Sequence, residues 1–158
     1  IIPKDSPRIM SLRDGEKKMS KSEDSDYSRI NLKDDKDLID KKIKKAKTDT
    51  KPIPSDIGGL KNRKEAFNLI SIYASLNNKK IDQVLSDIGG KNFSTFKSKL
   101  SECIIETICP IGNEIKKLLK DERYLYTNLS EGSKKAQMIA KNNLKKIYEI
   151  MGLTKFSL

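Results

Sequence analysis

Hydrophobic positions recur at helical spacing over most of the chain. In residues 34–47 they gather on one face with lysines opposite, which predicts an amphipathic helix. Asp34 or Asp35 can cap its amino end, because a carboxylate there accepts hydrogen bonds from free backbone N–H groups. The lysines of its last turn suit the carbonyl end of the helix dipole. The apolar positions of this predicted helix are Leu38, Ile39, Ile43 and Ala46.

Two further helices are predicted in the middle of the chain. Residues 48–59 hold two prolines and two glycines and predict a loop before the first of them. A helix is then expected to start at Asn62, with Glu65 at capping-box spacing. Its apolar stripe consists of Phe67, Ile70, Tyr73 and Ala74. A shorter helix over residues 81–88 should stop at Gly89-Gly90, where left-handed backbone costs little.

The last third predicts four helices separated by breakers. The first covers residues 94–108, and Pro110 is expected to break or kink it. Its inward side chains should be Phe96, Leu100, Cys103, Ile104 and Ile108. The others are predicted over residues 111–120, 122–129 and 133–151, with Gly132 closing the second of these and Gly152 the last. The last helix has an apolar face made of Ala136, Ile139, Ala140, Leu144, Ile147, Tyr148 and Met151.

The amino-terminal part reads differently. Ile9, Met10 and Leu12 form a short apolar, strand-like segment, and Asp14-Gly15 predicts a turn after it. A polar loop follows. The chain shows no convincing hairpin and no internal repeat. The fold class expected is therefore mainly α, with a helical module behind a strand and a loop.

Charge adds one hypothesis to this picture. The net charge is +11, from 33 basic and 22 acidic residues. Residues 1–60 carry 15 basic and 12 acidic side chains, whereas residues 61–158 carry 18 and 10. The later segment holds most of the surplus, as expected if it approaches a polyanion. A solvated lysine surface would give the same count, so charge alone leaves both interpretations open.

Composition also excludes several kinds of chemistry. The chain has no histidine, which removes an imidazole base, a histidine metal ligand and a Ser-His or Cys-His pair. No run of about 18 apolar residues occurs, so no membrane span is predicted. Cys103 and Cys109 are about 9 Å apart along a helix, too far for a disulfide, and are expected to be buried and reduced, as in the cytoplasm. The start at Ile1 has neither a methionine nor a signal-peptide core and is interpreted as an interior cut.

The most specific feature is residues 18–22, Lys-Met-Ser-Lys-Ser, in the polar loop after Asp14-Gly15. Two ammonium groups and two hydroxyls on such a loop suit a triphosphate whose charge moves onto a leaving pyrophosphate. An exposed loop in a lysine-rich protein is the plainer interpretation. The full pentapeptide after a strand and a turn is more specific than lysine pairs alone.

The stretch over residues 8–49 resembles the signature region of bacterial and organellar tryptophanyl-tRNA synthetases, which are class I aminoacyl-tRNA synthetases. Residues 26–32, Asp-Tyr-Ser-Arg-Ile-Asn-Leu, favour the tryptophan enzyme over its tyrosine relative. The likeness continues through Gly59-Leu60, residues 68–76 and Gly89-Gly90 to the helical tail, but covers only the C-terminal half of such an enzyme. The histidine-bearing signature and the tryptophan pocket of the family are absent from this chain.

The resemblance implies that residues 1–34 finish a Rossmann-type α/β catalytic domain, with a strand and the Lys-Met-Ser-Lys-Ser loop. Residues 35–158 would form an α-helical anticodon-binding bundle. The implied enzyme is a tryptophan–tRNA ligase, which activates tryptophan with ATP and Mg²⁺ and transfers it to tRNA(Trp). A homodimeric parent enzyme in the cytoplasm is implied, with no metal ligand in this chain. The chain alone is expected to be inactive.

The family's loop roles transfer to matching positions. Lys18 and Lys21 are implied as the catalytic lysines that bind the triphosphate tail and stabilise departing pyrophosphate, with Lys21 the stronger candidate. The implied ATP-binding residues are Ile9, Lys18, Met19, Ser20, Lys21 and Ser22. Glu23 and Asp24 stand where the family commonly has aspartate and proline, which bears on the exit path of the loop.

Candidate tRNA contacts are Arg123, Tyr124 and Tyr126, because arginine and aromatic side chains recognise unstacked anticodon bases. Packing of both tyrosines is the competing interpretation. Two other protein classes stay open: a related class I ligase of the tyrosyl type, and a non-catalytic basic helical module that binds nucleic acid.

Overall fold

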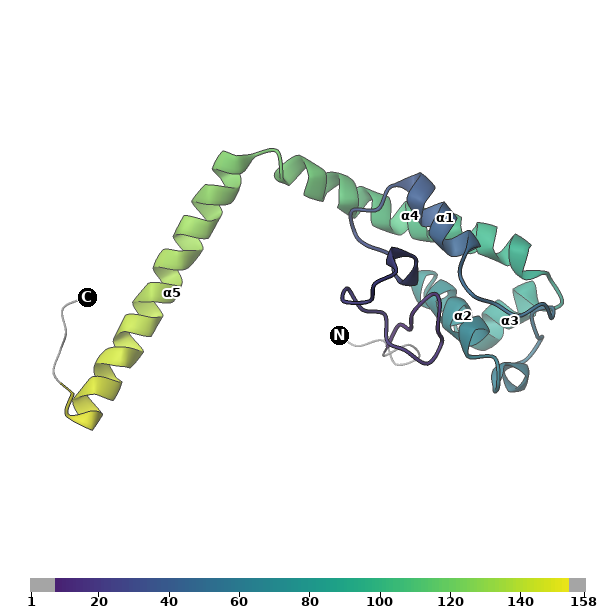
Figure 1. Ribbon diagram of the computed structural model, residues 1–158, viewed down its shortest axis with the longest axis horizontal. Coiled ribbons are helices and arrows are strands. Elements are labelled where there is room, and N and C mark those ends of the chain that lie inside the picture. The colour runs from purple at the N-terminus through teal and green to yellow at the C-terminus, as the bar shows by residue number, and fades with distance from the viewer. Residues whose placement is uncertain (1–7, 154–158) are drawn as a thin grey trace. The chain divides into compact units, whose positions relative to one another are not determined.

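The computed structural model describes residues 8–153, and over this range the protein is mainly α-helical (Figure 1). The helices are α1 (Lys36–Lys44), α2 (Lys64–Leu76), α3 (Ile81–Ile88), α4 (Phe93–Leu118) and α5 (Glu122–Met151). Short 3₁₀ turns, η1 (Asp26–Ser28) and η2 (Ile57–Leu60), lie in the connecting segments. The prediction of a mainly α protein is confirmed.

Between residues 8 and 153, β pairing is limited to one antiparallel bridge between Met10 and Lys18. The strand expected around Ile9 to Leu12 is therefore reduced to a single bridge here. The chain divides into two compact units, Ile1–Glu114 and Ile115–Leu158.

The first unit has one hydrophobic core, to which α1, α2, α3 and the first half of α4 all contribute. Its most deeply buried apolar side chains, each at most 2% exposed, are Leu12, Ile39, Ile43, Ile53, Ala66, Leu69, Ile70, Val84, Leu85, Phe96 and Leu100. The rings of Tyr73 and Phe96 meet edge to face at 5.6 Å between centroids. This core holds the amino-terminal segment, because Leu12 lies inside it.

Helix α1 follows its sequence signal at the start and departs from it inside. Asp35 is the N-cap, and its carboxylate accepts a hydrogen bond from the Leu38 N–H at 2.8 Å. The lysines were all expected on the solvent face. That expectation is wrong for Lys42, which is completely buried between the carboxylates of Asp26 and Asp34.

Helix α2 begins at Lys64, two residues later than predicted, and the expected capping box from Asn62 does not form. The residue before the helix, Arg63, is held in place by its guanidinium. That group makes two bonds to Asp49, at 2.6 and 2.7 Å, and one to the Pro52 carbonyl at 2.8 Å. A bidentate arginine–carboxylate pair thus fixes the loop before α2.

Glycine signals gave mixed results. Helix α3 ends as predicted, and Gly90 adopts a φ of 76°, in the left-handed region that favours glycine. Gly152 likewise ends α5 with a φ of 64°. Gly132 does not end a helix, because α5 runs unbroken from Glu122 to Met151. A single helical glycine costs only about 1 kcal/mol, which a helix of this length can absorb.

Pro110 does not break α4, which continues to Leu118. The proline is solvent-exposed, so water can satisfy the carbonyl that loses its N–H partner. Two residues later, Gly112 is buried, and a Cβ there would lie 2.5 Å from the Leu32 carbonyl oxygen. The helix is therefore held past the proline by close packing of Gly112 on the segment before α1.

The predicted inward face of α4 is confirmed for Phe96, Leu100 and Ile104, which are buried. Cys103 and Ile108 are half-buried instead. Both cysteines, Cys103 and Cys109, are free thiols and half-buried, so the prediction of fully buried thiols is wrong. Burial raises the pKa of the Cys103 thiol, which keeps it protonated at neutral pH.

Candidate functional site

The Lys-Met-Ser-Lys-Ser loop begins against the amino-terminal segment. The Ser11 N–H donates to the Lys17 carbonyl at 2.7 Å, and the Met19 N–H donates to the Ile9 carbonyl at 3.1 Å. These bonds flank the Met10–Lys18 bridge. The first two residues of the pentapeptide are therefore fixed by backbone pairing, and the following residues project from this support.

The turn expected at Asp14-Gly15 is present. The Asp14 carboxylate accepts from the Glu16 N–H at 2.9 Å, and this bond is the main reason that the pKa of Asp14 is lowered. A Cβ on Gly15 would lie 2.7 Å from the backbone of Lys64 and of Glu65, at the start of α2. Only glycine permits this approach, so the turn is seated on the amino end of α2.

The other edge of the amino-terminal segment is satisfied by a side chain. The Asn68 amide oxygen accepts from the Met10 N–H at 3.0 Å, and its amide nitrogen donates to the Met10 carbonyl at 2.9 Å. Asn68 is only 4% exposed and comes from α2. The Asn68 side chain thus satisfies the two backbone groups of Met10 that a neighbouring strand would otherwise bind. Asn68 was not among the residues predicted for the site.

The cationic side chains of the loop face solvent. Lys18 and Lys21 are both exposed, and within residues 8–153 neither side chain forms an ion pair or a hydrogen bond. Their neighbour Lys17, by contrast, lies 3.7 Å from the Asp14 carboxylate. Two ammonium groups without a carboxylate neighbour are available to an anionic ligand.

The two hydroxyls of the pentapeptide lie together. Ser20 Oγ and Ser22 Oγ are 2.9 Å apart, and the Ser22 N–H donates to Ser20 Oγ at 3.3 Å. Met19 is half-buried and packs against the core. Ile9 is 46% exposed at the adjoining edge. Of the six predicted ATP-binding positions, residues 18–22 are consecutive, and the structure adds Ile9 to them through its backbone bond with Met19.

The exit of the loop is pinned to the same unit. The Leu12 N–H donates at 2.8 Å to the carbonyl of Ser28, the last residue of η1. The Lys45 ammonium lies 4.6 Å from the centre of the Tyr27 ring, a cation–π contact. Both ends of the loop thus return to residues 9–12.

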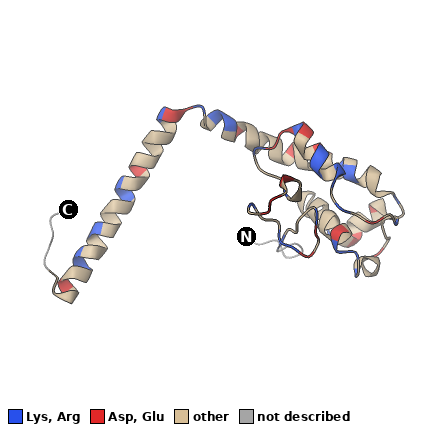
Figure 2. Ribbon diagram, in the orientation of Figure 1, with Lys and Arg blue, Asp and Glu red and all other residues tan. Residues whose placement is uncertain are grey.

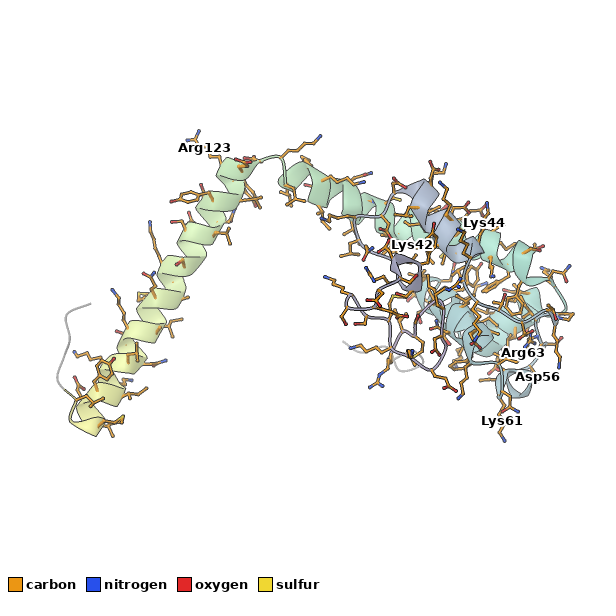
Figure 3. The ribbon with its side chains drawn as sticks, viewed as in Figure 1. Lys42, Lys44, Asp56, Lys61, Arg63 and Arg123 are labelled. Carbon is orange, nitrogen blue, oxygen red and sulfur yellow. The ribbon has the colours of Figure 1, made fainter. Side chains whose placement is uncertain are left out.

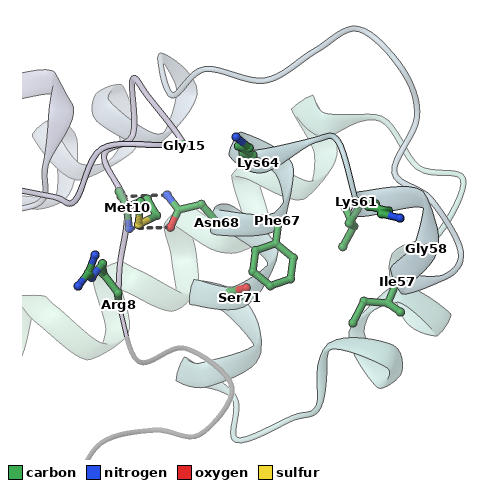
Figure 4. A pocket seen from close by; sticks show the side chains of 11 residues that line it. Arg8, Met10, Gly15, Ile57, Gly58, Lys61, Lys64, Phe67, Asn68 and Ser71 are labelled. Atoms are coloured by element: carbon green, nitrogen blue, oxygen red, sulfur yellow. Dashed lines mark hydrogen bonds between the residues drawn. The ribbon is translucent and has the colours of Figure 1, made fainter.

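A cavity of about 640 Å³ adjoins the amino-terminal segment (Figure 4). Its apolar lining includes Met10, Ile57 and Phe67, and basic side chains surround it. Sequence patterns gave no sign of this cavity. Phe67 was expected on the inner face of α2 but is 39% exposed because it lines this hollow.

The candidate tRNA contacts lie in the second unit, on the first turns of α5 (Figure 3 labels Arg123). Tyr124 is 52% exposed and Tyr126 is 75% exposed, so neither packs inside this unit. Helix α5 contains no buried residue, and lysines recur along it (Figure 2).

Residues 8–153 contain no cluster of three or more metal-ligating side chains. No helix within that range is both long and apolar enough to cross a bilayer.

Comparison with known proteins assigns a class to this fold and loop. The family model of class I tRNA synthetases (W and Y) matches residues 2–108, and the chain belongs to this family. The resemblance inferred from the pentapeptide and residues 26–32 is confirmed.

The curated relatives are more specific. The tryptophan–tRNA ligase of Agrobacterium fabrum is 49% identical over 152 residues, covering 96% of this chain and 43% of that protein. The tryptophan–tRNA ligase of Rhizobium meliloti is 46% identical over the same length and shares. The crystal structure of tryptophanyl-tRNA synthetase from Mycoplasma pneumoniae superposes with a TM-score of 0.75 at 27% identity, over 96% of this chain and 45% of that one. The chain thus spans less than half the length of these relatives and matches a C-terminal part of the ligases.

Proposed function

We propose that this chain is the phosphate-handling and tRNA-contacting part of a tryptophan–tRNA ligase. The observation that carries the proposal is the 49% identity to a tryptophan–tRNA ligase over 152 residues, which include the whole loop region. The tyrosyl alternative is less favoured, because both curated relatives described above are tryptophan–tRNA ligases. The overall reaction would join tryptophan to tRNA(Trp) through an aminoacyl-adenylate.

Residues 1–34 would complete a Rossmann-type catalytic domain, and residues 35–158 would form the anticodon-binding region. In the first step the carboxylate of tryptophan attacks the α-phosphorus of ATP, and pyrophosphate leaves. A carboxylate is already a nucleophile, so this step needs no base from this chain. Catalysis then consists mainly of positioning and charge neutralisation.

Lys21 and Lys18 would supply the neutralising charge at the leaving pyrophosphate. Both side chains are exposed on a loop that is anchored at both ends, which supports this role. The paired hydroxyls of Ser20 and Ser22 would donate hydrogen bonds to phosphate oxygens, and Met19 and Ile9 would border the adenosine. Mg²⁺ would arrive bound to the phosphates of ATP, since this ion prefers phosphate oxygens and water to an all-protein cage.

The basic helical part would approach tRNA. Its surplus charge supports attraction to phosphates, and the exposure of Tyr124 and Tyr126 supports stacking on unstacked anticodon bases. Arg123 would add hydrogen bonds or charge. The working enzyme would be a cytoplasmic homodimer, as the family resemblance implies.

Amino-acid-dependent exchange of pyrophosphate into ATP tests the proposal in the full-length ligase to which we assign this chain. Exchange is expected with tryptophan and not with tyrosine. Exchange with tyrosine alone would establish the tyrosyl alternative, and exchange with neither would favour a non-catalytic module. The chain by itself is expected to give no exchange.

A further inference from the structure

Lys42 is a buried cation that the loop chemistry does not use. Its ammonium lies 2.6 Å from Asp34 Oδ2 and 2.7 Å from Asp26 Oδ2, and its side chain has no exposed surface. Burying an ammonium group costs several kcal/mol unless opposite charges compensate, and two carboxylates do so here. The function of this buried charge therefore depends on which segments its two ion pairs connect.

The two carboxylates belong to different parts of the chain. Asp34 is 6% exposed and lies directly before the N-cap of α1, the helix that carries Lys42. Asp26 is 47% exposed and is the first residue of η1. It lies at the exit of the loop that carries the Lys-Met-Ser-Lys-Ser pentapeptide, residues 15–26, which we call the phosphate loop. Lys42 therefore connects α1 to the loop exit, and α1 is itself fixed in the core by Ile39 and Ile43.

Further bonds extend from Asp26 into the loop. Its Oδ1 accepts from Arg29 and from Asn31, each at 3.0 Å. The Arg29 guanidinium also donates to the Glu23 carbonyl at 2.8 Å, one residue after the pentapeptide. The Lys42 contact is the main reason that the pKa of Asp26 is lowered, so this carboxylate is ionised at neutral pH.

We propose that Lys42 is a positioning residue, which through Asp26 fixes the exit of the phosphate loop so that Lys21 is held ready for the triphosphate. The inference rests on the proposed function for its catalytic consequence. Pairing of residues 17–19 with residues 9–11 fixes only the entrance of the loop. The Leu12–Ser28 bond and the Tyr27–Lys45 contact hold the chain at residues 27–28, and the contact at Asp26 extends this support through Arg29 to Glu23. Without the contact at Asp26, ATP would have to order residues 20–25 at a cost in binding free energy, and the lysines would spend less time in the productive position.

Asp26→Asn tests this inference, because Lys42 keeps Asp34 as a partner and the core charge stays compensated. The matched control is Asp87→Asn, which removes an ion pair of similar length, 2.8 Å to Lys79, at a similarly exposed carboxylate away from the loop. Asp26→Glu serves as the rescue variant. Each is made in the full-length ligase and in the 158-residue chain.

In the ligase, Asp26→Asn should lower kcat for tryptophan-dependent pyrophosphate exchange by about 10-fold to 100-fold with the KM for tryptophan unchanged. Asp87→Asn should match the wild type, and Asp26→Glu should recover part of the loss. A kcat within twofold of the wild type would overturn the inference.

Amide hydrogen exchange in the chain itself separates this inference from the proposed function. Asp26→Asn should speed exchange at residues 20–25 relative to Asp87→Asn, with the exchange of α2 unchanged. Unchanged loop exchange would refute positioning by Lys42, whatever reaction the ligase performs. Wild-type ligase without tryptophan-dependent exchange would refute the proposed function while leaving the loop measurement to decide the role of Lys42.

Discussion

Replacing Asn68 with alanine should destabilise the first unit strongly. The side chain pairs with both backbone groups of Met10, at 3.0 and 2.9 Å, and is 4% exposed. Alanine leaves a donor and an acceptor without partners. Each buried group left unsatisfied costs about 1–3 kcal/mol, and half-exposure of Met10 lets water recover part of that. The expected loss in the free energy of unfolding is about 2–4 kcal/mol.

Urea denaturation of the 158-residue chain, followed by circular dichroism, measures this loss. The matched control is Asn62→Ala, because Asn62 is exposed and α2 begins without its help, so its loss should stay below about 0.5 kcal/mol. Asn68→Asp adds a second test. It keeps the acceptor for the Met10 N–H but turns an ionised oxygen toward the Met10 carbonyl, so protonation should relieve the loss as pH falls. Equal stability of Asn68→Ala and Asn62→Ala would refute this reasoning.

Three further outcomes are expected. Gly112→Ala should destabilise the chain by about 1–3 kcal/mol, because its Cβ would lie 2.5 Å from a backbone carbonyl, whereas Gly132→Ala, with open space around it, should stabilise by about 0.5–1 kcal/mol in the same urea assay. The hydrogen bonds from Arg63 lower the pKa of Asp49, so the stability from this pair is present above the ordinary pKa of the carboxylate and is lost as pH falls through its lowered pKa. Arg63→Gln should flatten this acidic part of a stability–pH profile. Affinity of the chain for tRNA should fall at least about tenfold between about 50 and 200 mM salt in a filter-binding titration, and a salt-independent affinity would argue against phosphate contacts.

Local signals in the sequence predicted α1, α3 and the end of α5. Asp35 caps α1 and Gly152 ends α5 because each acts through its own backbone or its nearest turn. The Asp14-Gly15 turn was also predicted, because its Asp14 carboxylate bonds to the N–H of Glu16, only two positions away.

The breaker rules failed where tertiary packing or helix length opposed them. Pro110 and Gly132 both lower the intrinsic stability of a helix, and a sequence pattern can indicate this. The contact of Gly112 with the Leu32 carbonyl, which supports α4 beyond its proline, is recorded by no local pattern.

The supporting residues of the site were missed for a related reason. Asn68 meets Met10 across 58 positions of sequence, and a buried asparagine at the edge of an apolar stripe is the one signal that could have revealed it. Lys42 appeared as one lysine among many, and only the fold brings Asp26 and Asp34 around it. A local pattern records which residues could touch a ligand, but not which distant residues hold them.

The rate of adenylate formation by a Lys21→Ala variant is the measurement that tests the central claim most directly. In single-turnover measurements on the full-length ligase, Lys21→Ala should slow adenylate formation by about 10²–10³-fold with little change in tryptophan affinity, because the lysine meets charge that develops in the transition state. Lys17→Ala is the matched control. This neighbouring exposed lysine lies beside Asp14, so its replacement should leave the rate of adenylate formation nearly unchanged. Equal rates for Lys21→Ala, Lys17→Ala and the wild type would contradict the assignment of this loop to the phosphates of ATP.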